Sequence, residues 1–365
     1  MRVAIVHYWL VNMRGGEKVL EALCELYPQA DIYTHVYDPE NISEAIKKHH
    51  ITTTFIQKLP KAIQWYQNYL PLMPFALWFL NLKNYDLVIG LESGPTKGAR
   101  LSKNAICINC CFTPMRYIWD LFDEYYASVG IFKKLMMLLC VKPLRWWDVF
   151  TSKRVDLFIS ISTIVKKRVK NCYGRDSVII YPPVEVDSFK ISPNIGDYYL
   201  MFGQLVSYKR PQLAVEAFNA SGKKLIVIGQ GELLGGLKKI AQPNIEFLGR
   251  LDDDSIRSYL SNCKALIFPG LEDFGIVPVE AMASGRPVIA YGQGGALDTV
   301  VDGKTGVFFQ EQTVHGLNQA IETFEKNARQ YKPIEIREWA RKFSKEHFQH
   351  QFLELVKPLL AIKKH

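Results

Sequence analysis

Short strand patterns alternate with longer helical patterns over most of the chain. In the first half they cover residues 3–8, 31–36, 85–90, 104–111 and 156–160, and in the second half residues 198–202, 264–268 and 287–290. Most of these runs are continuously apolar, which is typical of strands buried on both faces. Strands that alternate with helices indicate parallel sheets, so we predict an α/β fold.

The chain has 365 residues, a length that suits two domains. Pro182, Pro183, Asp187 and Pro193 indicate a linker between the halves. We therefore predict an N-terminal domain over residues 1–190 and a C-terminal domain over residues 191–340. The remaining segment is residues 341–365. Helical patterns cover residues 334–343, at the boundary of this segment, and residues 349–360 within it.

Residues 268–285 combine a strand end, a glycine-containing loop and a predicted helix over residues 279–284. Glu272 lies in the loop and Glu280 about one turn into the helix, so both carboxylates point toward the helix start. The free N–H groups of residues 274–277 suit an anion such as a phosphate. Donors for a phosphate beside acceptors for hydroxyls fit a sugar phosphate. A plain helix start with acidic residues that stabilise the dipole is the alternative.

The same stretch resembles the Glu-x7-Glu signature of family-four retaining glycosyltransferases, which have the GT-B fold. The resemblance implies two Rossmann-like domains that face a central cleft, and a final helix (residues 341–365) that returns to the first domain. It implies that Glu272 holds hydroxyls of the donor sugar and Glu280 the ribose. It also implies a reaction that needs no bound metal or other cofactor, with a nucleotide-diphosphate sugar as substrate.

Three further loops of the second half belong to this hypothesis. Lys209 and Arg210 precede a predicted helix over residues 212–220, a good position for binding a diphosphate; a solvated basic turn is the alternative. The family usually has arginine where this chain has Gln204, directly after a glycine. Gly231 follows a strand in a G-x-G-x-x-x-G spacing, one residue too long for a dinucleotide fingerprint. By resemblance, Arg250 is a neighbour of the nucleotide base.

In the first half, Gly15 and Gly16 precede a helix predicted from Lys18, where a backbone can approach a phosphate closely; a tight turn is equally consistent. Residues 111–120 resemble a segment of bacterial O-antigen and exopolysaccharide mannosyltransferases. Phe112 departs from that pattern, which usually has histidine, and phenylalanine cannot form the same hydrogen bonds. Lys97, in a loop after a strand, either contacts an anion or is solvated.

The resemblance yields a set of candidate residues. Thr113, Arg116 and Asp120 are candidates on the acceptor or sugar side, with a structural salt bridge as the alternative for the two charged residues. Glu272, Lys209 and Arg210 are the candidate catalytic residues. The predicted donor site comprises Gly15, Gly16, Lys209, Arg210, Gly231, Arg250, Glu272, Phe274, Gly275, Ile276, Val277 and Glu280.

The excess of positive charge in the first half suggests an anionic partner. The chain has a net charge of +9, and residues 1–190 hold 24 basic against 17 acidic residues. Residues 65–82 and 131–150 mix aromatic and apolar residues with lysine and arginine, a combination that suits an anionic membrane surface. Helices packed on the domain core are the alternative. No nucleic-acid motif is present.

The N-terminus reads as a strand rather than a signal peptide, and seven irregularly spaced cysteines favour a reducing compartment. Cys107 and Cys110 form a C-x-x-C without the second ligand pair that a zinc site requires. We therefore expect a cytoplasmic protein, peripheral to the inner face of the cell membrane.

The predicted function is transfer of a hexose with retention from a nucleotide sugar to a glycan acceptor in cell-surface polysaccharide synthesis. We expect this acceptor to be lipid-linked. Mannose from GDP-mannose is the best candidate by resemblance. With no obvious nucleophile, the departing phosphate is expected to take the acceptor's proton. A non-catalytic sugar-nucleotide-binding protein and an oxidoreductase on the same type of sheet are the alternatives.

Overall fold

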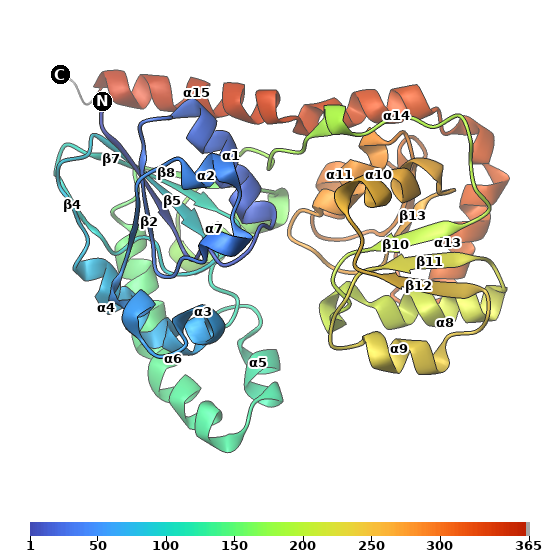
Figure 1. The fold of residues 1–365 in the computed structure, drawn as a ribbon, viewed down its shortest axis with the longest axis horizontal. Helices are drawn as coiled ribbons and strands as arrows, with labels where there is room; N and C mark the ends of the chain where they lie inside the picture. Colours follow the sequence, from blue (N-terminus) through green and yellow to red (C-terminus); the bar gives the residue numbers. More distant parts are fainter. Residues whose placement is uncertain (363–365) are drawn as a thin grey trace. The chain divides into compact units, whose positions relative to one another are not determined.

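The computed structural model describes residues 1–362 and divides into two compact units. Unit 1 contains residues 1–182 together with the chain from Phe348 onward, and unit 2 contains Pro183–His347. Figure 1 shows both units with their elements labelled. Each unit has its own sheet and its own buried core, and the two are described separately.

A seven-stranded parallel sheet forms the centre of unit 1, in the order β3-β2-β1-β5-β7-β8-β9. Its register pairs Ile5 with Ile32 on one side and with Ile89 on the other. Every residue of β1, β5 and β7 is buried, as expected for strands covered on both faces. The strands are β1 (Val3–His7), β2 (Asp31–Thr34), β3 (Ile51–Thr53), β5 (Leu87–Glu92), β7 (Ile106–Cys111), β8 (Leu157–Ser160) and β9 (Ser177–Ile179).

Alternating strand residues direct the two faces of this sheet to different helices. Ile5 and Ile89 join a core cluster with α1 (Gly15–Leu26) and α15 (Lys345–Ile362), whereas Ala4 and Val88 pack with α4 (Met73–Trp78). On the second face, α7 (Thr163–Tyr173) covers the β7–β8 end. Unit 1 also contains the long helix α6 (Ile131–Ser152). Its shorter elements include α2 (Glu44–Lys47), α3 (Ala62–Trp65), η3 (Tyr66–Leu72), β4 (Asn81–Leu82), β6 (Arg100–Leu101) and α5 (Phe122–Ser128).

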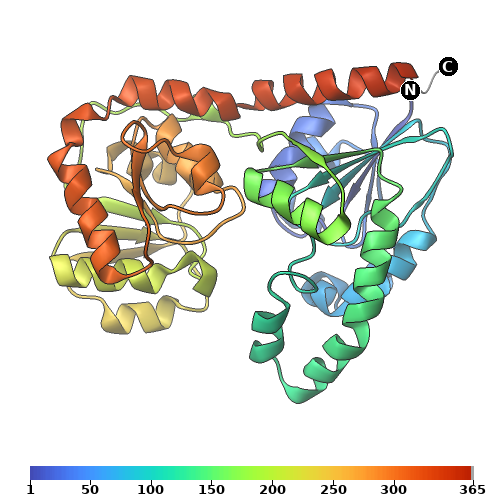
Figure 2. The ribbon, with the colours of Figure 1, turned by 180° about the vertical axis from the view of Figure 1, so that it is seen from behind.

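Helix α15 completes the core of unit 1 from the far end of the chain. Phe348, Phe352 and Val356 follow one another at intervals of one helical turn and are all buried in the same cluster as β1 and α1. The Gln349 side chain donates a hydrogen bond to the Ala22 carbonyl of α1 over 3.0 Å. Figure 2 shows α15 running along this unit from the opposite side.

Unit 2 is a second doubly wound sheet of six parallel strands, in the order β12-β11-β10-β13-β14-β15. Helices α8 and α13 pack together on one face, while α11 contacts α10 and α14 on the other. The elements are β10 (Tyr199–Phe202), η5 (Ser207–Lys209), α8 (Pro211–Ser221), β11 (Leu225–Ile228), α9 (Leu234–Ile240), β12 (Ile245–Gly249), α10 (Asp253–Asn262), β13 (Leu266–Phe268), α11 (Ile276–Ala283), β14 (Val288–Tyr291), α12 (Ala296–Thr299), β15 (Gly306–Phe309), α13 (Val314–Lys326) and α14 (Pro333–Ala340).

Both sheets reverse their strand order once, between β1 and β5 in unit 1 and between β10 and β13 in unit 2. At such a switch point the loops leave in opposite directions and open a crevice at the carboxyl ends of the strands. The prediction of an α/β protein with two parallel sheets is thus confirmed. The two switch points are where ligand-binding groups are expected.

Two helix starts differ from the prediction. Helix α1 begins at Gly15 rather than Lys18, and α11 begins at Ile276 rather than Val279. Pro278 explains the second difference, because the first turn of a helix tolerates proline, whose missing N–H has no intrahelical partner there. Within residues 1–362, none of the helices combines the length and the apolar composition needed to cross a bilayer.

Candidate functional site

The switch point of unit 2 brings a cation and a carboxylate together. Lys209 ends η5 after β10, and Glu272 lies in the loop after β13, so they come from the two strands that flank the switch point. The Lys209 Nζ lies 2.9 Å from the Glu272 Oε1, and their side chains are 16% and 18% exposed. Both groups therefore remain accessible to a ligand at this edge. The sequence predicted these residues separately, and the structure brings them into contact.

Glycines allow the loops at this edge to pack backbone against backbone. A Cβ on Gly270 would lie 2.6 Å from the Cα of Lys209, and one on Gly231 would lie 2.3 Å from the carbonyl oxygen of Leu205. The Gly295 N–H donates to the Glu272 carbonyl over 2.8 Å. The loops after β10, β11, β13 and β14 are therefore fixed against one another, which holds Lys209 and Glu272 in place.

Helix α11 presents its N-terminus at the same edge. Gly275 caps it at φ 86°, a left-handed conformation that favours glycine. Ile276 and Val277 occupy its first two positions, where N–H groups have no acceptor within the helix. Phe274 is buried and its ring stacks edge-on against Phe343, so only its backbone can face a ligand. The predicted anion site is thus a short run of amides.

The remaining predicted donor residues surround this edge. Glu280 is half-buried in the second turn of α11, and Arg250 is exposed after β12, two strands away from β10. Arg210 caps α8 and is exposed, with a positive φ of 52° that only one other described non-glycine residue, Lys61, shares. It forms no ion pair within residues 1–362. Its guanidinium is therefore available to an anion.

The switch point of unit 1 carries the glycine pair and the departure at position 112. Gly15 starts α1, and a Cβ on Gly16 would lie 2.9 Å from both the Phe112 ring and the Tyr8 hydroxyl. Phe112 is buried, with its ring edge-on to Tyr8. Aromatic side chains therefore fill the space beside Gly16, and Phe112 lies where the resembled segment has an imidazole.

Glu17, in the first turn of α1, is buried beside His7. Its Oε1 lies 3.7 Å from the His7 Nε2, and its Oε2 accepts a hydrogen bond from the Arg14 backbone over 2.8 Å. Burial raises the pKa of Glu17 from 4.5 to about 7, and burial lowers the pKa of His7 to about 3. At neutral pH the imidazole is therefore uncharged and the carboxyl is half-protonated.

This raised pKa predicts a pH-dependent stability. A carboxyl that binds its proton more tightly when folded stabilises the fold fully below 4.5, and the contribution is lost as the pH rises through about 7. We expect Glu17→Gln to gain about 1–3 kcal/mol over the wild type at pH 8 and little at pH 5. Thermal unfolding of both proteins across this range measures the difference. Parallel stability curves would contradict it.

The loop over residues 113–120 is tied to helix α7 by Arg168. The guanidinium Nη1 of Arg168 donates to the Thr113 hydroxyl over 3.2 Å, and its Nε forms an ion pair with Asp120. Arg116 is half-buried in the same loop. Two of the three candidate acceptor residues thus share one arginine. Sequence reasoning missed Arg168, because nothing distinguishes it from the neighbouring cations Lys166, Lys167 and Lys170.

The sequence of unit 2 is similar to a known protein family. Residues 187–343 match the family model "Glycosyl transferases group 1". That segment covers nearly all of unit 2, including Lys209, Glu272 and Glu280. This segment is therefore similar to group 1 glycosyltransferases, and the relatives below support the same assignment.

The relatives agree with the family match. The chain is 28% identical over 211 residues to an uncharacterized glycosyltransferase of Methanocaldococcus jannaschii, an alignment that covers 55% of this chain and 59% of that protein. It is 38% identical to the alpha-1,3/1,6-mannosyltransferase ALG2 of Dictyostelium discoideum, with 53% and 64% covered. A GDP-mannose-dependent alpha-(1-6)-phosphatidylinositol monomannoside mannosyltransferase of Mycobacterium tuberculosis is 25% identical, with 46% and 51% covered. The chain thus spans between 51% and 64% of the length of these curated relatives.

Solved structures establish the fold class. Anabaena HepE in complex with UDP matches with a TM-score of 0.71 at 16% identity, over 98% of this chain and 100% of that one. The sucrose-phosphate synthase of Thermosynechococcus elongatus matches with the same TM-score and identity, over 99% and 100%. Two parallel-sheet units with these neighbours define the GT-B fold, which confirms the fold predicted from the signature.

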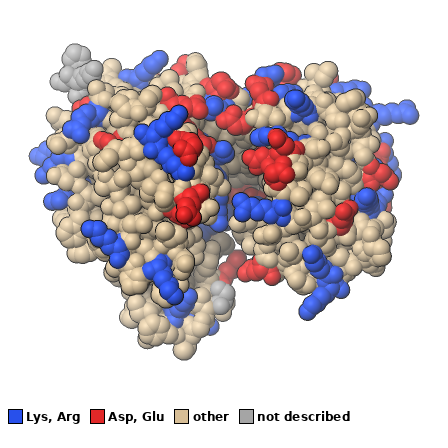
Figure 3. Space-filling model, viewed as in Figure 1, with Lys and Arg blue, Asp and Glu red and all other residues tan. Residues whose placement is uncertain are grey.

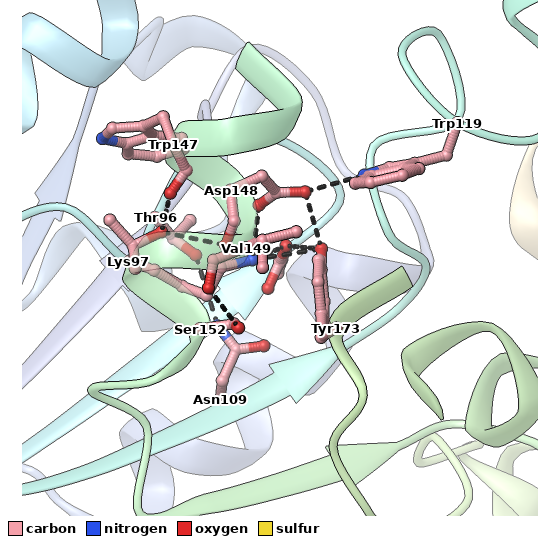
Figure 4. Close-up of polar contacts among 11 residues, drawn as sticks. Thr96, Lys97, Asn109, Trp119, Trp147, Asp148, Val149, Ser152 and Tyr173 are labelled. Carbon is pink, nitrogen blue, oxygen red and sulfur yellow. Dashed lines mark hydrogen bonds and ion pairs between the residues drawn. The ribbon is translucent and has the colours of Figure 1, made fainter. Parts of the chain in front are cut away.

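Outside the segment that matches the family model, unit 1 contains a group of buried charged side chains (Figure 4). Lys97 forms ion pairs with Glu92 and with Asp148, whose Oδ1 lies 2.8 Å from its Nζ. The Tyr173 hydroxyl lies 2.8 Å from Glu92 and 3.0 Å from Asp148, and the Trp119 indole N–H donates to Asp148 over 2.9 Å. We call these five residues the buried cluster.

The buried cluster corrects both interpretations of Lys97. Its side chain is neither solvated nor open to a ligand, because it is 2% exposed and both its partners are fully buried. Burial raises the pKa of Glu92, and although burial opposes the charge of Lys97, the charges of Asp148 and Glu92 raise its pKa. Two carboxylates therefore depend on one ammonium group for their compensation.

The opposite edge of the unit 2 sheet has a pocket of about 230 Å³, near the amino ends of β10 and β14. Its charged residues are already engaged: Arg286 donates to backbone carbonyls of Ser261 and Ser192, and Glu325 pairs with Lys223. These contacts hold both side chains in place and stabilise the unit. The carboxyl edge remains the candidate site.

The cysteines and acidic residues show no metal centre. Cys107 and Cys110 lie buried on β7, and burial raises the pKa of Cys110 to about 12. Among the residues that the structure describes, no group of three or more His, Cys, Asp and Glu side chains is arranged to hold a metal ion.

Proposed function

We propose that this chain is a retaining glycosyltransferase that moves a hexose from a nucleotide-diphosphate sugar to a hydroxyl group of a glycan. The observation that carries the proposal is the contact of Lys209 with Glu272 at the unit 2 switch point, beside the N-terminus of α11. A sugar diphosphate carries its negative phosphates directly next to the hydroxyls of its sugar. A cation and a carboxylate that lie side by side match this arrangement.

The proposed roles follow from charge and hydrogen-bonding capacity. Lys209 and Arg210 would stabilise the negative charge that develops on the leaving diphosphate, together with the amides of Ile276 and Val277. Glu272 would accept hydrogen bonds from hydroxyls of the donor sugar, and Glu280 from those of the ribose. Gly231 and Arg250 would lie near the nucleotide. Gly15 and Gly16 remain candidates for a backbone contact with the diphosphate.

In the proposed step, the bond between the anomeric carbon and the phosphate oxygen breaks. The acceptor oxygen forms the new bond to that carbon on the same face, and its proton passes to the departing phosphate. Fixed cations and backbone dipoles would supply the charge stabilisation, so the proposal includes no metal ion or other cofactor. Thr113, Arg116 and Asp120 are the candidates for contacts with the acceptor.

The relatives' names guide the choice of substrates. One is GDP-mannose-dependent and others are mannosyltransferases, which supports mannose from GDP-mannose as the first donor to test. The name of the former includes a phosphatidylinositol glycan, which supports a lipid-linked acceptor. We propose that the protein acts at the inner face of the cell membrane, in synthesis of a cell-surface polysaccharide such as an O-antigen.

The test has two stages. Thermal unfolding of the full chain is measured with GDP-, UDP- and ADP-sugars, and we expect GDP-mannose to stabilise it most, because a ligand that binds only the folded state raises its stability. The preferred labelled donor is then incubated with lipid extracts to detect transfer. Binding without transfer across the panel would favour a non-catalytic binding protein, and stabilisation by nicotinamide dinucleotides alone would favour an oxidoreductase.

A further inference from the structure

The first half of α6 exposes its large apolar side chains to solvent. Ile131 is 85% exposed, Phe132 75%, Leu135 55% and Leu139 63%, whereas Val141 and Leu144 in the second half are buried. The first half of the helix is therefore largely outside the core, whereas the second half carries both buried and exposed apolar side chains. Exposed apolar side chains in this number on one helix mark an interaction surface.

Helix α4 adds a second group of exposed apolar side chains. Phe75, Trp78 and Phe79 are each more than half exposed. The inward side of α4, at Met73 and Ala76, shares one core cluster with Val141 and Leu144 of α6. Both helices are thus apolar toward the core and toward solvent, although one apolar face would suffice for packing. We call the exposed side chains of α4 and α6 the docking surface.

The charges around the docking surface have one sign. No Asp or Glu occurs between residues 45 and 85 or between residues 125 and 147, whereas Lys61, Lys83, Lys133, Lys134 and Lys142 lie in these segments. The acidic residues that flank the second segment are Glu124, in the first turn of α5, and Asp148, which is buried within α6. Figure 3 shows the lobe that holds α6 as mainly tan and blue.

The start of α6 concentrates this positive charge. Its first turn has no acidic residue but contains Lys133 and Lys134, and its N-cap Gly130 provides no side-chain cap. Lysines at a helix N-terminus are unfavourable in water, because the helix dipole is positive there. An anionic surface would attract both the lysines and the positive end of the helix dipole, and would so compensate the repulsion between them.

From the apolar side chains and the positive charge together, we infer that the docking surface inserts into the interface of an anionic lipid bilayer. Trp78 and Trp146, 54% and 66% exposed, suit the level of the lipid headgroups. Lysine stems extend along apolar surface while their charges meet lipid phosphates. The inference does not depend on the proposed function, but it would give that function access to a lipid-linked acceptor.

The test measures sedimentation of the full chain with vesicles of phosphatidylcholine alone or mixed with phosphatidylserine. We expect binding to the anionic vesicles, weakened by salt. The double variant Leu135→Gln/Leu139→Gln should lose vesicle affinity by about tenfold or more, because it removes two apolar side chains from the interface. Lys133→Glu/Lys134→Glu should lose the preference for phosphatidylserine.

The matched control is Ile334→Gln, which replaces a side chain that is 71% exposed in unit 2 and should bind like the wild type. Unchanged thermal unfolding verifies that the α6 variants fold, as expected for substitutions at exposed positions. No vesicle binding by the wild type, or equal binding by wild type and the leucine variant, would overturn the inference. Neither readout requires a sugar nucleotide, so failure here leaves the proposed function open to its own test.

Discussion

Lys97→Met is expected to lower the free energy of unfolding of unit 1 by about 3–5 kcal/mol, because it leaves buried carboxylates without their cation. Glu92 and Asp148 are fully buried, and Lys97 is the ion-pair partner of both. Methionine fills a similar volume, so the loss reports charge rather than a cavity. The Tyr173 hydroxyl carries only one proton and cannot donate to both carboxylates at once.

Urea unfolding followed by tryptophan fluorescence measures this effect, since six of the seven tryptophans lie in unit 1. Lys170→Met is the matched control: its ion pair with Asp176 is exposed, and its loss should leave the urea midpoint close to that of the wild type. Adding Glu92→Gln to Lys97→Met should restore part of the stability by removing one of the two charges. A loss below about 1 kcal/mol in Lys97→Met would show that the buried cluster is not held by this cation.

The buried cluster also connects the parts of unit 1 that the proposed functions use. Asp148 belongs to α6, which carries much of the docking surface, and it accepts a hydrogen bond from Trp119 in the loop of the acceptor candidates. Glu92 ends β5, and its carbonyl accepts from the Phe112 N–H over 2.8 Å. One network of polar contacts thus fixes α6, the residue 113–120 loop and the switch point of the sheet.

The sequence predicted the features that depend on the pattern of residues within short stretches of the chain. Apolar strand patterns and the position of loops after strands were sufficient for the parallel sheets. They also predicted that Lys209 and Glu272 lie at the carboxyl edge of one sheet, because the carboxyl ends of parallel strands share an edge. The mixture of apolar, aromatic and basic residues in residues 131–150 was visible as well, although only the structure shows which residues of α6 are exposed.

Pairings between distant residues could not be predicted. Glu92 and Tyr173 are 81 positions apart, and Trp119 and Asp148 are 29 apart, with no pattern in the sequence that links them. A lysine in a loop resembles a solvated or ligand-binding residue unless its partners are known. The same reason hid Arg168, whose contacts with Thr113 and Asp120 depend on how α7 packs.

Lys209→Ala is expected to reduce kcat/KM for glycosyl transfer by about 10²–10³, the effect of removing one positioned group that stabilises developing charge. Affinity for the nucleoside diphosphate should fall as well, because the ammonium group also meets the ground-state phosphates. Glu272→Gln should raise KM and lower kcat, since an amide accepts hydrogen bonds from sugar hydroxyls less strongly than a carboxylate. Arg210→Ala should have a smaller effect, as its exposed side chain is less fixed.

Lys223→Ala provides the control, because Lys223 forms an ion pair with Glu325 in the same unit, away from the carboxyl edge. Its loss should leave kcat/KM unchanged. Steady-state transfer and calorimetric titration with the diphosphate separate the two effects of Lys209. If Lys209→Ala and Glu272→Gln both retain wild-type turnover and diphosphate affinity, the pair at the switch point is only a structural ion pair. The donor would then have to bind elsewhere, because the proposal depends on the cation, the carboxylate and the α11 amides that meet at the carboxyl edge of the unit 2 sheet.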